Sequence, residues 1–409
     1  MKLYSWIFLV SFIFRVTTLL ILPEPQVSYN AQFAYIKGAQ MLVEGQGFAD
    51  PTFPVYTPPL YSLVIASLAF LFGGDGTVAI KIVQIVLDSA TAVLLCLIAR
   101  EIFDSSVGLL SAAIWAVYPF TIYSTLYVGT EVLFTFLLAV WVWFTIWAIK
   151  SARWEYYCAA GVSLGLATLT RGTTQFMPLV LLALMFAFRE RGFAWIRMYA
   201  LTMVAFALII LPWGIRNYIV LKEFIPVGAN SSVILYGASE PMLTIGEGRA
   251  KEVARLYEEA KTRGIVPPPE DHPPAERDRY LGKVAIDHYQ TRLRNDPADL
   301  SMYVVKKFFR LWYSTESGNN HGATFAINFG LYILAGIGIM LSWKQGNRKA
   351  FAMLVLVGYF VFIHWMTLPL FRYMIPVMPY LSIFAAMGML SIANRKWPQI
   401  SQKIALLQK

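Results

Sequence analysis

Four charged residues stand at the ends of long apolar runs in this chain: Glu131, Arg171, Arg216 and Arg372. A bilayer disfavours an isolated charge by roughly 2.5–3.5 kcal/mol on insertion scales, so such residues are usually paired or functional. A carboxylate in such a place can act as a general base, and the planar donor fork of a guanidinium matches a phosphate. If the helices bring the four residues to one side, they predict a polar site at a membrane surface that handles something charged.

Each of these residues also has a plainer interpretation. Glu131 can be an acid that faces a helix dipole, with Thr130 as the cap. Arg171 can extend to the interface where a helix ends. Arg216 and Arg372 can belong to an ordinary belt of aromatic and basic residues. Spacing alone leaves both interpretations open for all four.

Two further charges fall inside one apolar run. Lys81 and Asp88 are seven residues apart, so they share a face of a helix. Lys81 lies near the expected outer end and is a candidate phosphate ligand. Asp88 lies deeper, and we expect it to be neutralised or paired with a neighbouring helix.

The run LPWGIRNY holds the third arginine. Pro212 and Gly214 predict a break in the helix at this point. Arg216 and Asn217 would then point into the outer site.

The composition is that of a polytopic membrane protein. Of 409 residues, 57% are hydrophobic and 14% charged, whereas a soluble domain has about a quarter charged residues. The net charge of +10 does not indicate nucleic-acid binding, because the basic residues cluster in short loops between apolar runs, where they set orientation.

No pattern of metal ligands or of nucleotide binding is present in the sequence. Cys96 and Cys158 lie inside apolar runs, and the four histidines lack metal-ligand spacing. There is no P-loop, no dinucleotide fingerprint and no nucleophile elbow. We therefore expect no metal and no cofactor, and we expect any activated donor to be a lipid rather than a nucleotide sugar.

The apolar runs predict an all-α fold with about ten transmembrane helices, since a helix needs roughly 20 apolar residues to cross a bilayer. The expected spans are 4–22, 79–99, 107–127, 131–149, 156–171, 174–188, 198–215, 326–343, 349–367 and 373–393. The run 58–73 is bounded by proline and glycine pairs, and we expect it to be a juxtamembrane helix.

The loop charges predict the orientation. Lys and Arg concentrate in alternate loops, which by the positive-inside rule places both termini in the cytoplasm and the four charged residues on the periplasmic or exterior face of the inner membrane. The chain then divides into three regions. These are 1–216, with a first outer loop at 23–78; an outer polar loop at 217–325, with helices near 247–263 and 275–294 and a surface helix at 303–313; and 326–409.

Several runs, taken in order, resemble the C superfamily of integral-membrane glycosyltransferases, and more narrowly the bacterial relatives of protein O-mannosyltransferases and of the lipid A aminoarabinose transferase. The runs are AYIKGAQMLVEGQGF, YTPPLYSLVIASLAFLFG, LYVGTEVLFTFLL, GLATLTRGTTQFMPLVLL, LPWGIRNYIVLKEFIPVGANSSVILYGAS and FRYMIPVMPYL. The resemblance covers most of the chain, from about residue 3 to 393.

The resemblance implies a hexosyl or pentosyl transferase that takes a monosaccharide from a polyprenyl-phosphate donor. Cationic residues would hold the lipid phosphate and a carboxylate would act on the acceptor, which is a lipid, glycan or protein. The partners are then lipids and an acceptor, with no nucleic acid. The residues that fall in the family's motifs, or beside them, are Glu131, Arg171, Arg216, Asn217, Arg372, Tyr373, Lys81, Tyr35 and Tyr61.

One departure from the family concerns the base. Relatives usually carry an acid a few residues before the tyrosine that matches Tyr35, whereas Asn30 or Ala31 stands at that point here. An amide cannot act as a general base. The role then falls to Glu131 or Asp50, or to Glu24 or Glu44; otherwise the chemistry differs or activity has been lost.

Two other functions stay open. A non-catalytic relative would bind a lipid-linked glycan without transferring it, which the missing acid favours. A transporter or flippase would need a polar path through the membrane and usually internal repeats, but the polar residues cluster at one face.

Overall fold

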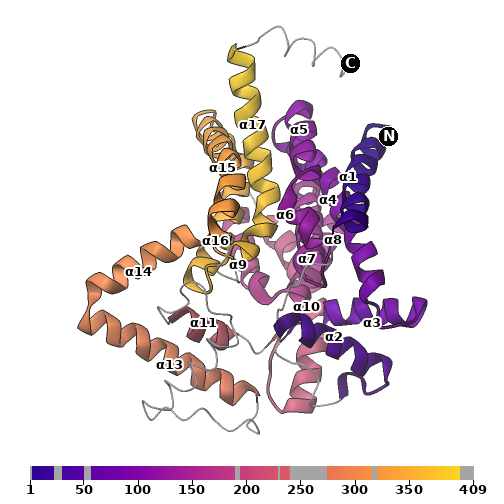
Figure 1. Cartoon of the computed structure of the whole chain (residues 1–409), viewed down its shortest axis with the longest axis vertical. Helices are drawn as coiled ribbons and strands as arrows, with labels where there is room; N and C mark the ends of the chain where they lie inside the picture. The colour runs from indigo at the N-terminus through magenta and orange to yellow at the C-terminus, as the bar shows by residue number, and fades with distance from the viewer. Residues whose placement is uncertain are drawn as a thin grey trace.

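The computed structural model describes residues 2–22, 30–49, 57–188, 194–228, 231–239, 274–315 and 320–396, and within these ranges every regular element is a helix (Figure 1). The predicted all-α class is confirmed. The helices are α1 (Lys2–Ile21), α2 (Asn30–Val43), η1 (Gly47–Ala49), α3 (Leu60–Phe72), α4 (Thr77–Ile102), α5 (Ser105–Ala116), α6 (Pro119–Ser124), α7 (Glu131–Ser151), α8 (Trp154–Thr170), η2 (Gly172–Thr174), α9 (Met177–Phe188), α10 (Ala194–Leu221), α11 (Ser231–Ser239), α13 (Pro274–Asn295), α14 (Pro297–Arg310), α15 (His321–Lys344), α16 (Arg348–Met366), η3 (Phe371–Val377) and α17 (Met378–Lys396).

In the described part of the chain, seven helices are long and apolar enough to cross a membrane: α1, α4, α7, α10, α15, α16 and the η3–α17 segment. Shorter apolar helices accompany them, among them α3 and α5. The polytopic character is therefore confirmed, while the total of about ten crossings stays a prediction.

Helix α4 packs against α1, α5 and α7, while α8 packs between α7 and α10. The C-terminal pair, α15 and α17, packs closely because two glycines face across it. A Cβ at Gly338 would lie 1.9 Å from the Phe384 carbonyl oxygen, and one at Gly388 would lie 2.1 Å from that of Leu334. Small residues at such a crossing let two backbones approach within the membrane.

The expected pairing of Asp88 is confirmed, and its partner is Arg15 on α1. The side chains of both are buried, at 0% and 2% exposure, and Arg15 Nε donates to the Asp88 carboxylate at 2.6 Å. Trp115 donates to the other carboxylate oxygen at 3.1 Å, and Ser11 and Ala116 accept from the guanidinium. The ions are thus paired and hydrogen-bonded, the condition under which buried charges are tolerated.

Two predicted helix boundaries are wrong. The expected continuous span at 107–127 is two helices, α5 and α6, because Pro119 pushes Tyr118 into an extended conformation (φ −70°, ψ 114°). Conversely, α10 runs through Pro212 and ends at Leu221. A proline removes one backbone hydrogen bond, and neighbouring groups make this tolerable in membrane helices.

One end of the bundle is crossed by short helices. In Figure 1, α2 and α3 lie across the foot of the bundle. Helix α3 has 13 residues, too few for the roughly 20 that span a bilayer. Its last three side chains, Phe70, Leu71 and Phe72, are 84%, 69% and 74% exposed. These features favour the juxtamembrane placement predicted for 58–73.

The same end carries α13 and α14, which extend away from the bundle in Figure 1. The expected helix at 275–294 is confirmed as α13, and the one near 247–263 lies outside the described residues. Helix α14, strongly amphipathic, covers most of the expected surface helix at 303–313. Its Lys307 is buried and donates to the Tyr289 hydroxyl at 3.2 Å and to the Met366 carbonyl at 3.1 Å.

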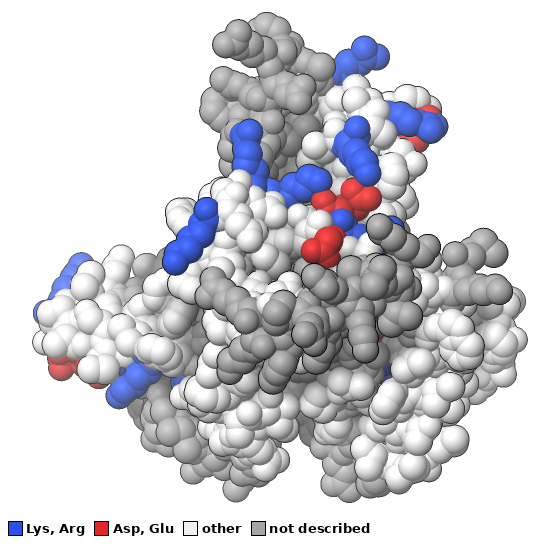
Figure 2. Space-filling model, turned by 90° about the horizontal axis from the view of Figure 1, so that it is seen from above, with Lys and Arg blue, Asp and Glu red and all other residues white. Residues whose placement is uncertain are grey.

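The opposite end of the bundle carries a group of basic side chains. Figure 2 shows Lys and Arg side chains distributed over the end at which α1 begins and α17 ends. Lys150 donates there to the Glu101 carboxylate at 2.9 Å, and Lys349 donates to the Glu101 backbone carbonyl at 2.8 Å. Basic residues at this end fit the predicted orientation, in which that end is cytoplasmic.

Candidate active site

A cavity of about 400 Å³ opens at the end of the bundle where α2 and α3 lie. Its walls come from α2, the start of α7, the turn after α8, the segment after α10, the end of α16 and η3. The lining includes five residues that the sequence singles out: Tyr35, Glu131, Arg171, Arg372 and Tyr373. Tyr35 and Tyr373, 338 positions apart in the chain, thus meet in one place, and the common-side prediction holds for Glu131, Arg171 and Arg372.

Glu131 and Arg171 form an ion pair at the centre of this lining. Glu131 opens α7 and is 3% exposed, and Arg171 ends α8 in an extended conformation (φ −145°, ψ 122°). Arg171 Nη2 lies 2.6 Å from Glu131 Oε1, and Arg171 Nε donates to the Thr130 hydroxyl at 2.9 Å. The Thr130 side chain makes no capping hydrogen bond to α7, so its hydroxyl orients Arg171 and does not cap the helix as the plainer interpretation required.

Tyr373 joins the two cavity arginines. The guanidinium carbon of Arg171 lies 5.5 Å from the Tyr373 ring centroid, and that of Arg372 lies 4.9 Å away. Arg372 also donates to the Tyr373 hydroxyl at 3.1 Å, and His364 stacks on the same ring at 5.0 Å. The negative face of an aromatic ring attracts cations, which offsets the repulsion between the two arginines.

The fixed charge of the cavity is positive. Its described lining contains two guanidinium groups and one carboxylate, so one positive charge is left when His364 is neutral. A phosphodiester carries one negative charge, and a guanidinium is the side chain best shaped to bind it. The cavity is therefore suited to hold one phosphate group beside a carboxylate.

The backbone that leads into Glu131 is held by a relay of hydrogen bonds. The Gly129 N–H donates to the Tyr61 hydroxyl at 2.9 Å, which donates to Gln84 Oε1 at 2.7 Å. Gln84 in turn donates to the Tyr127 carbonyl at 2.9 Å. Tyr61 is fully buried and does not line the cavity, so the structure gives it a positioning contact, while a substrate contact stays a prediction.

Gly129 itself leaves room for the carboxylate. A Cβ at this position would lie 2.5 Å from Glu131 Oε2 and 2.5 Å from the Tyr127 ring. Real Cβ atoms do not approach other atoms so closely, so any larger residue would displace the carboxylate or the ring.

Tyr35 supplies a neutral hydroxyl to the cavity. Its ring packs edge-on against Tyr61 at 5.3 Å, and its hydroxyl is hydrogen-bonded to Thr130. Burial raises the pKa of Tyr35 to about 12, with the nearby Arg171 acting in the opposite direction. The group therefore stays protonated at neutral pH and can donate a hydrogen bond.

The structure does not place Arg216 or Asn217 among the residues that line the cavity. Arg216 donates to the Phe48 carbonyl and, at 2.9 Å, to Asn217 Oδ1. Asn217 is fully buried and donates to the Ile225 carbonyl at 2.7 Å. The expectation that this pair points into the site is not met, because α10 continues past Pro212 and carries both side chains beyond it.

The PWGIRN run instead holds a cavity wall in place. Trp213 donates to the Val227 carbonyl at 2.7 Å, and Val227 and Gly228 line the cavity. Together with the bond from Asn217 to Ile225, this fixes the segment after α10. A substrate-binding role for Arg216 stays a prediction. In the structure its side chain joins α10 to the Phe48 carbonyl and to Asn217.

The remaining predicted residues lie elsewhere or outside the described structure. Lys81 is half-buried on α4 and does not line the cavity. Glu44 is exposed after α2 and accepts from Gln46 at 3.1 Å. Asn30 begins α2, but its side chain is outside the description, as are Asp50 and Glu24 altogether. Their roles stay predictions.

The sequence reasoning missed several polar residues of the lining, among them Gln32, Thr173 and His364. Gln32 and Thr173 carry no charge, so the search for unexpected charges in apolar runs passes over them. His364 was interpreted as structural or solvated because it lacks metal-ligand spacing. In the ranges that the structure covers, no group of three or more His, Cys, Asp or Glu gathers as a metal site would.

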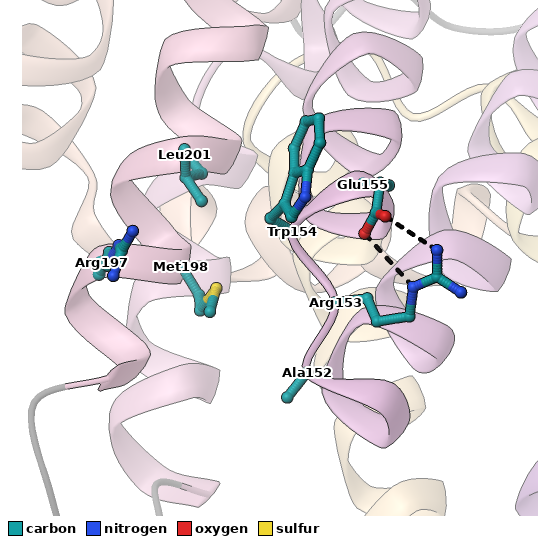
Figure 3. Close-up of a pocket in the computed structure, with 7 residues that line it drawn as sticks. All are labelled: Ala152, Arg153, Trp154, Glu155, Arg197, Met198 and Leu201. Atoms are coloured by element: carbon teal, nitrogen blue, oxygen red, sulfur yellow. Dashed lines mark hydrogen bonds and ion pairs between the residues drawn. The ribbon is translucent and has the colours of Figure 1, made fainter.

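A second hollow, of about 560 Å³, lies at the opposite end, between the start of α8 and the start of α10 (Figure 3). Figure 3 shows Arg153 directed at Glu155, and the shortest contact between them is 2.8 Å. Their side chains are 62% and 43% exposed, and such surface pairs contribute little. None of the residues predicted for chemistry lines this hollow, so we assign the site to the smaller cavity.

Comparison with known proteins agrees with this fold. The chain resembles the crystal structure of the oligosaccharyltransferase of Archaeoglobus fulgidus in the apo form, with a TM-score of 0.61 and 14% identity over 98% of this chain and 52% of that chain. The same values hold for that enzyme, AglB, in complex with an inhibitory peptide and a dolichol-phosphate. The present chain thus spans about half the length of these proteins.

A structure of ArnT from Cupriavidus metallidurans is also similar, at 15% identity over 98% of this chain and 81% of that chain, but its TM-score of 0.44 is too low to support a conclusion. No curated protein matches the sequence. Residues 56–215 match the family model of dolichyl-phosphate-mannose-protein mannosyltransferases, a segment that contains Glu131 and Arg171. The predicted resemblance is thereby confirmed for residues 56–215, and the fold of nearly the whole chain is similar to that of the oligosaccharyltransferase.

Proposed function

We propose that this protein is a membrane glycosyltransferase that moves a monosaccharide from a polyprenyl-phosphate donor to a lipid, glycan or protein acceptor. The observation that carries the proposal is the Glu131–Arg171 ion pair beside Arg372 in one cavity of net positive charge. The likeness to AglB, which has been solved with a dolichol-phosphate, supports a lipid phosphate as the ligand.

In the proposed reaction, the cavity arginines hold the phosphate of the donor. Arg171 uses Nε and Nη2 for Thr130 and Glu131, while a guanidinium has five donors. The acceptor hydroxyl attacks the anomeric carbon as the bond from that carbon to the phosphate oxygen breaks. The proton of the hydroxyl passes to a carboxylate, and the polyprenyl phosphate leaves with both bonding electrons. Positive charge near the leaving oxygen stabilises the negative charge that develops there.

Glu131 is the carboxylate that the described cavity offers as the base. Its carboxylate is held by Arg171 within the cavity lining. No resident metal or cofactor enters the proposal.

A transfer assay tests this function. The full chain in lipid nanodiscs is incubated with radiolabelled polyprenyl-phosphate sugars and a membrane extract as acceptor, and compared with Glu131→Gln, Arg372→Gln and Arg100→Gln. Arg100 ends α4 at the opposite end of the bundle and serves as the control. We expect label on the acceptor, at least about 100-fold less with Glu131→Gln, and wild-type transfer with Arg100→Gln. Lipid binding without transfer from any donor would instead identify a non-catalytic binder.

We also propose an inner-membrane location with the cavity on the periplasmic or exterior face. The basic end shown in Figure 2 supports it through the positive-inside rule. Single cysteines at Ser301 on α14 and at Gln345 after α15 test it, because they lie at opposite ends of the bundle. In intact cells, an impermeant maleimide should label the cysteine at 301 alone. Labelling of the one at 345 alone would reverse the orientation.

A further inference from the structure

Two neutral polar atoms of the cavity lining have no hydrogen-bond partner among the described residues: Gln32 Oε1 and Thr173 Oγ1. Both atoms are almost completely buried, although their residues line the cavity. Buried polar groups are normally paired, and each exception requires an explanation. A ligand with hydroxyl groups supplies the missing partners, because a hydroxyl both donates to an amide oxygen and exchanges hydrogen bonds with a threonine.

Both side chains are carried by backbone that is already fixed. Gln32 lies on α2, three residues before Tyr35, so the two occupy one face of the helix. Thr173 lies in η2, and its carbonyl accepts from the Tyr359 hydroxyl of α16 at 2.5 Å. The neighbouring Thr174 shares a hydrogen bond with Thr168 at 2.8 Å. The two unpaired atoms therefore belong to two separate elements of the cavity lining, α2 and η2.

The charges of the cavity limit what this ligand can be. Across the described lining, Glu131 is the one carboxylate, and Arg171 already neutralises it. An ammonium group on the ligand would find no unpaired carboxylate there and would face Arg372. A second anionic group would exceed the single positive charge that the donor phosphate already balances. Within the described lining, the charge balance therefore favours an uncharged ligand group beside the phosphate.

We infer that the cavity selects a neutral, hydroxyl-bearing sugar, recognised through Gln32 and Thr173, over amino sugars and uronic acids. The inference rests on the proposed function, since the sugar is the part of the donor next to the phosphate. Gln32 and Thr173 are then specificity-determining residues for that donor.

Equilibrium binding separates the sugar from the phosphate. The full chain in nanodiscs is titrated with undecaprenyl phosphate alone and with its neutral hexose, 4-amino-pentose and uronic acid forms. The variants are Gln32→Leu, Gln32→Glu, Thr173→Val and the control Gln40→Leu, which changes an exposed glutamine of the same helix. A hydrogen bond to a neutral group changes affinity by about five- to tenfold.

We expect the wild type and Gln40→Leu to bind the hexose donor tightest. Gln32→Leu and Thr173→Val should each bind it about five- to tenfold more weakly, with unchanged affinity for undecaprenyl phosphate. Gln32→Glu should shift the preference toward the amino sugar, because it supplies the missing carboxylate. The inference would be overturned if the wild type bound all three sugar donors equally, or if all variants bound the hexose donor equally. Either result would leave the proposed function in place. Failure of the wild type to bind undecaprenyl phosphate would overturn both.

Discussion

The Arg171 guanidinium and the Glu131 carboxylate lie 2.6 Å apart and join the end of α8 to the start of α7. Both side chains are largely buried, at 12% and 3% exposure. Removing one partner of such a pair leaves a buried charge without compensation, which costs about 3–5 kcal/mol. The same pair thus sets both the stability of the site and the charge that a donor meets.

A double-mutant cycle separates these two effects. We expect Arg171→Gln to destabilise the protein by about 3–5 kcal/mol, since Glu131 would then be buried unpaired. Glu131→Gln should abolish transfer yet keep or strengthen the binding of undecaprenyl phosphate, because Arg171 gains freedom to bind it. The double variant should recover stability but bind the lipid weakly. Thermal unfolding measures the stability, and lipid titration in nanodiscs measures the binding. If the two single variants lose stability additively in the double variant, Glu131 and Arg171 are not energetically coupled.

Gly129→Ala should reduce transfer strongly while leaving the protein folded. The added methyl group would lie 2.5 Å from Glu131 Oε2, so the carboxylate must move, and a displacement of about 1 Å near a reaction centre can cost roughly 100-fold in rate. Gly358→Ala, where a Cβ meets nothing within 4 Å, is the matched control. Initial transfer rates for the two variants give the comparison, and equal rates would show that the carboxylate position is not critical.

Tyr61→Phe breaks the relay that holds Gly129. The Gly129 N–H and Gln84 would each lose a partner, and a buried group left unpaired costs about 1–3 kcal/mol. We expect a lower melting temperature and slower transfer with little change in lipid affinity, because Tyr61 does not line the cavity. Tyr123→Phe, on a 45% exposed residue of α6, provides the control for loss of a hydroxyl.

The crossing of α15 and α17 should tolerate no side chain at Gly338. In Gly338→Ala the methyl group would lie 1.9 Å from the Phe384 carbonyl oxygen, so the helices must separate, at a cost of about 1–3 kcal/mol or more. Gly336→Ala lies two residues away, where a Cβ meets nothing within 4 Å. Thermal unfolding should show a loss for the first variant only. Equal melting temperatures would mean that the two helices are not in close contact.

Lys307 should make stability depend on pH. Burial lowers the pKa of its amine from 10.5 to about 8, so the folded state disfavours the charged form. The unfolded chain then binds more protons between these values, and stability rises with pH by up to about 1.4 kcal/mol per unit from pH 8 toward 10.5. Lys307→Met removes this rise, whereas Lys306→Met, an exposed neighbour, retains it. The test is the melting temperature of the three proteins measured between pH 6.5 and 9.5. Parallel plots of melting temperature against pH would refute the lowered pKa of Lys307.

The sequence was sufficient for features that depend on polarity along one helix. The need of Asp88 for a partner follows from its depth in an apolar run, and Arg15 meets it. Glu131, Arg171 and Arg372 were found because each is a charge at the end of such a run. Arg216 satisfies the same criterion yet lies outside the cavity lining, because its direction depends on whether α10 continues beyond Pro212. The end of α10 is held by contacts with the carbonyls of Phe48, Ile225 and Val227. These contacts form only in the folded chain and cannot be inferred from the sequence around Pro212.

The neutral part of the site could not be predicted in this way. Gln32 and Thr173 are ordinary in type and spacing. Their side-chain oxygen atoms are unusual because the folded chain buries them without a hydrogen-bond partner. The position of the base is likewise a tertiary property, since Tyr61 and Gln84 act through backbone atoms of the segment before α7. Polar atoms that act through packing leave no periodic signal along the chain.

The relay through Tyr61 also connects the segment before Glu131 to the exposed apolar end of α3. Tyr61 belongs to α3, and that helix ends in three exposed apolar side chains, Phe70, Leu71 and Phe72. With α3 at the bilayer surface, as predicted, its depth among the lipids would set the height of the hydroxyl that holds Gly129. The position of the Glu131 carboxylate would then be referenced to the membrane surface as well as to the helical bundle.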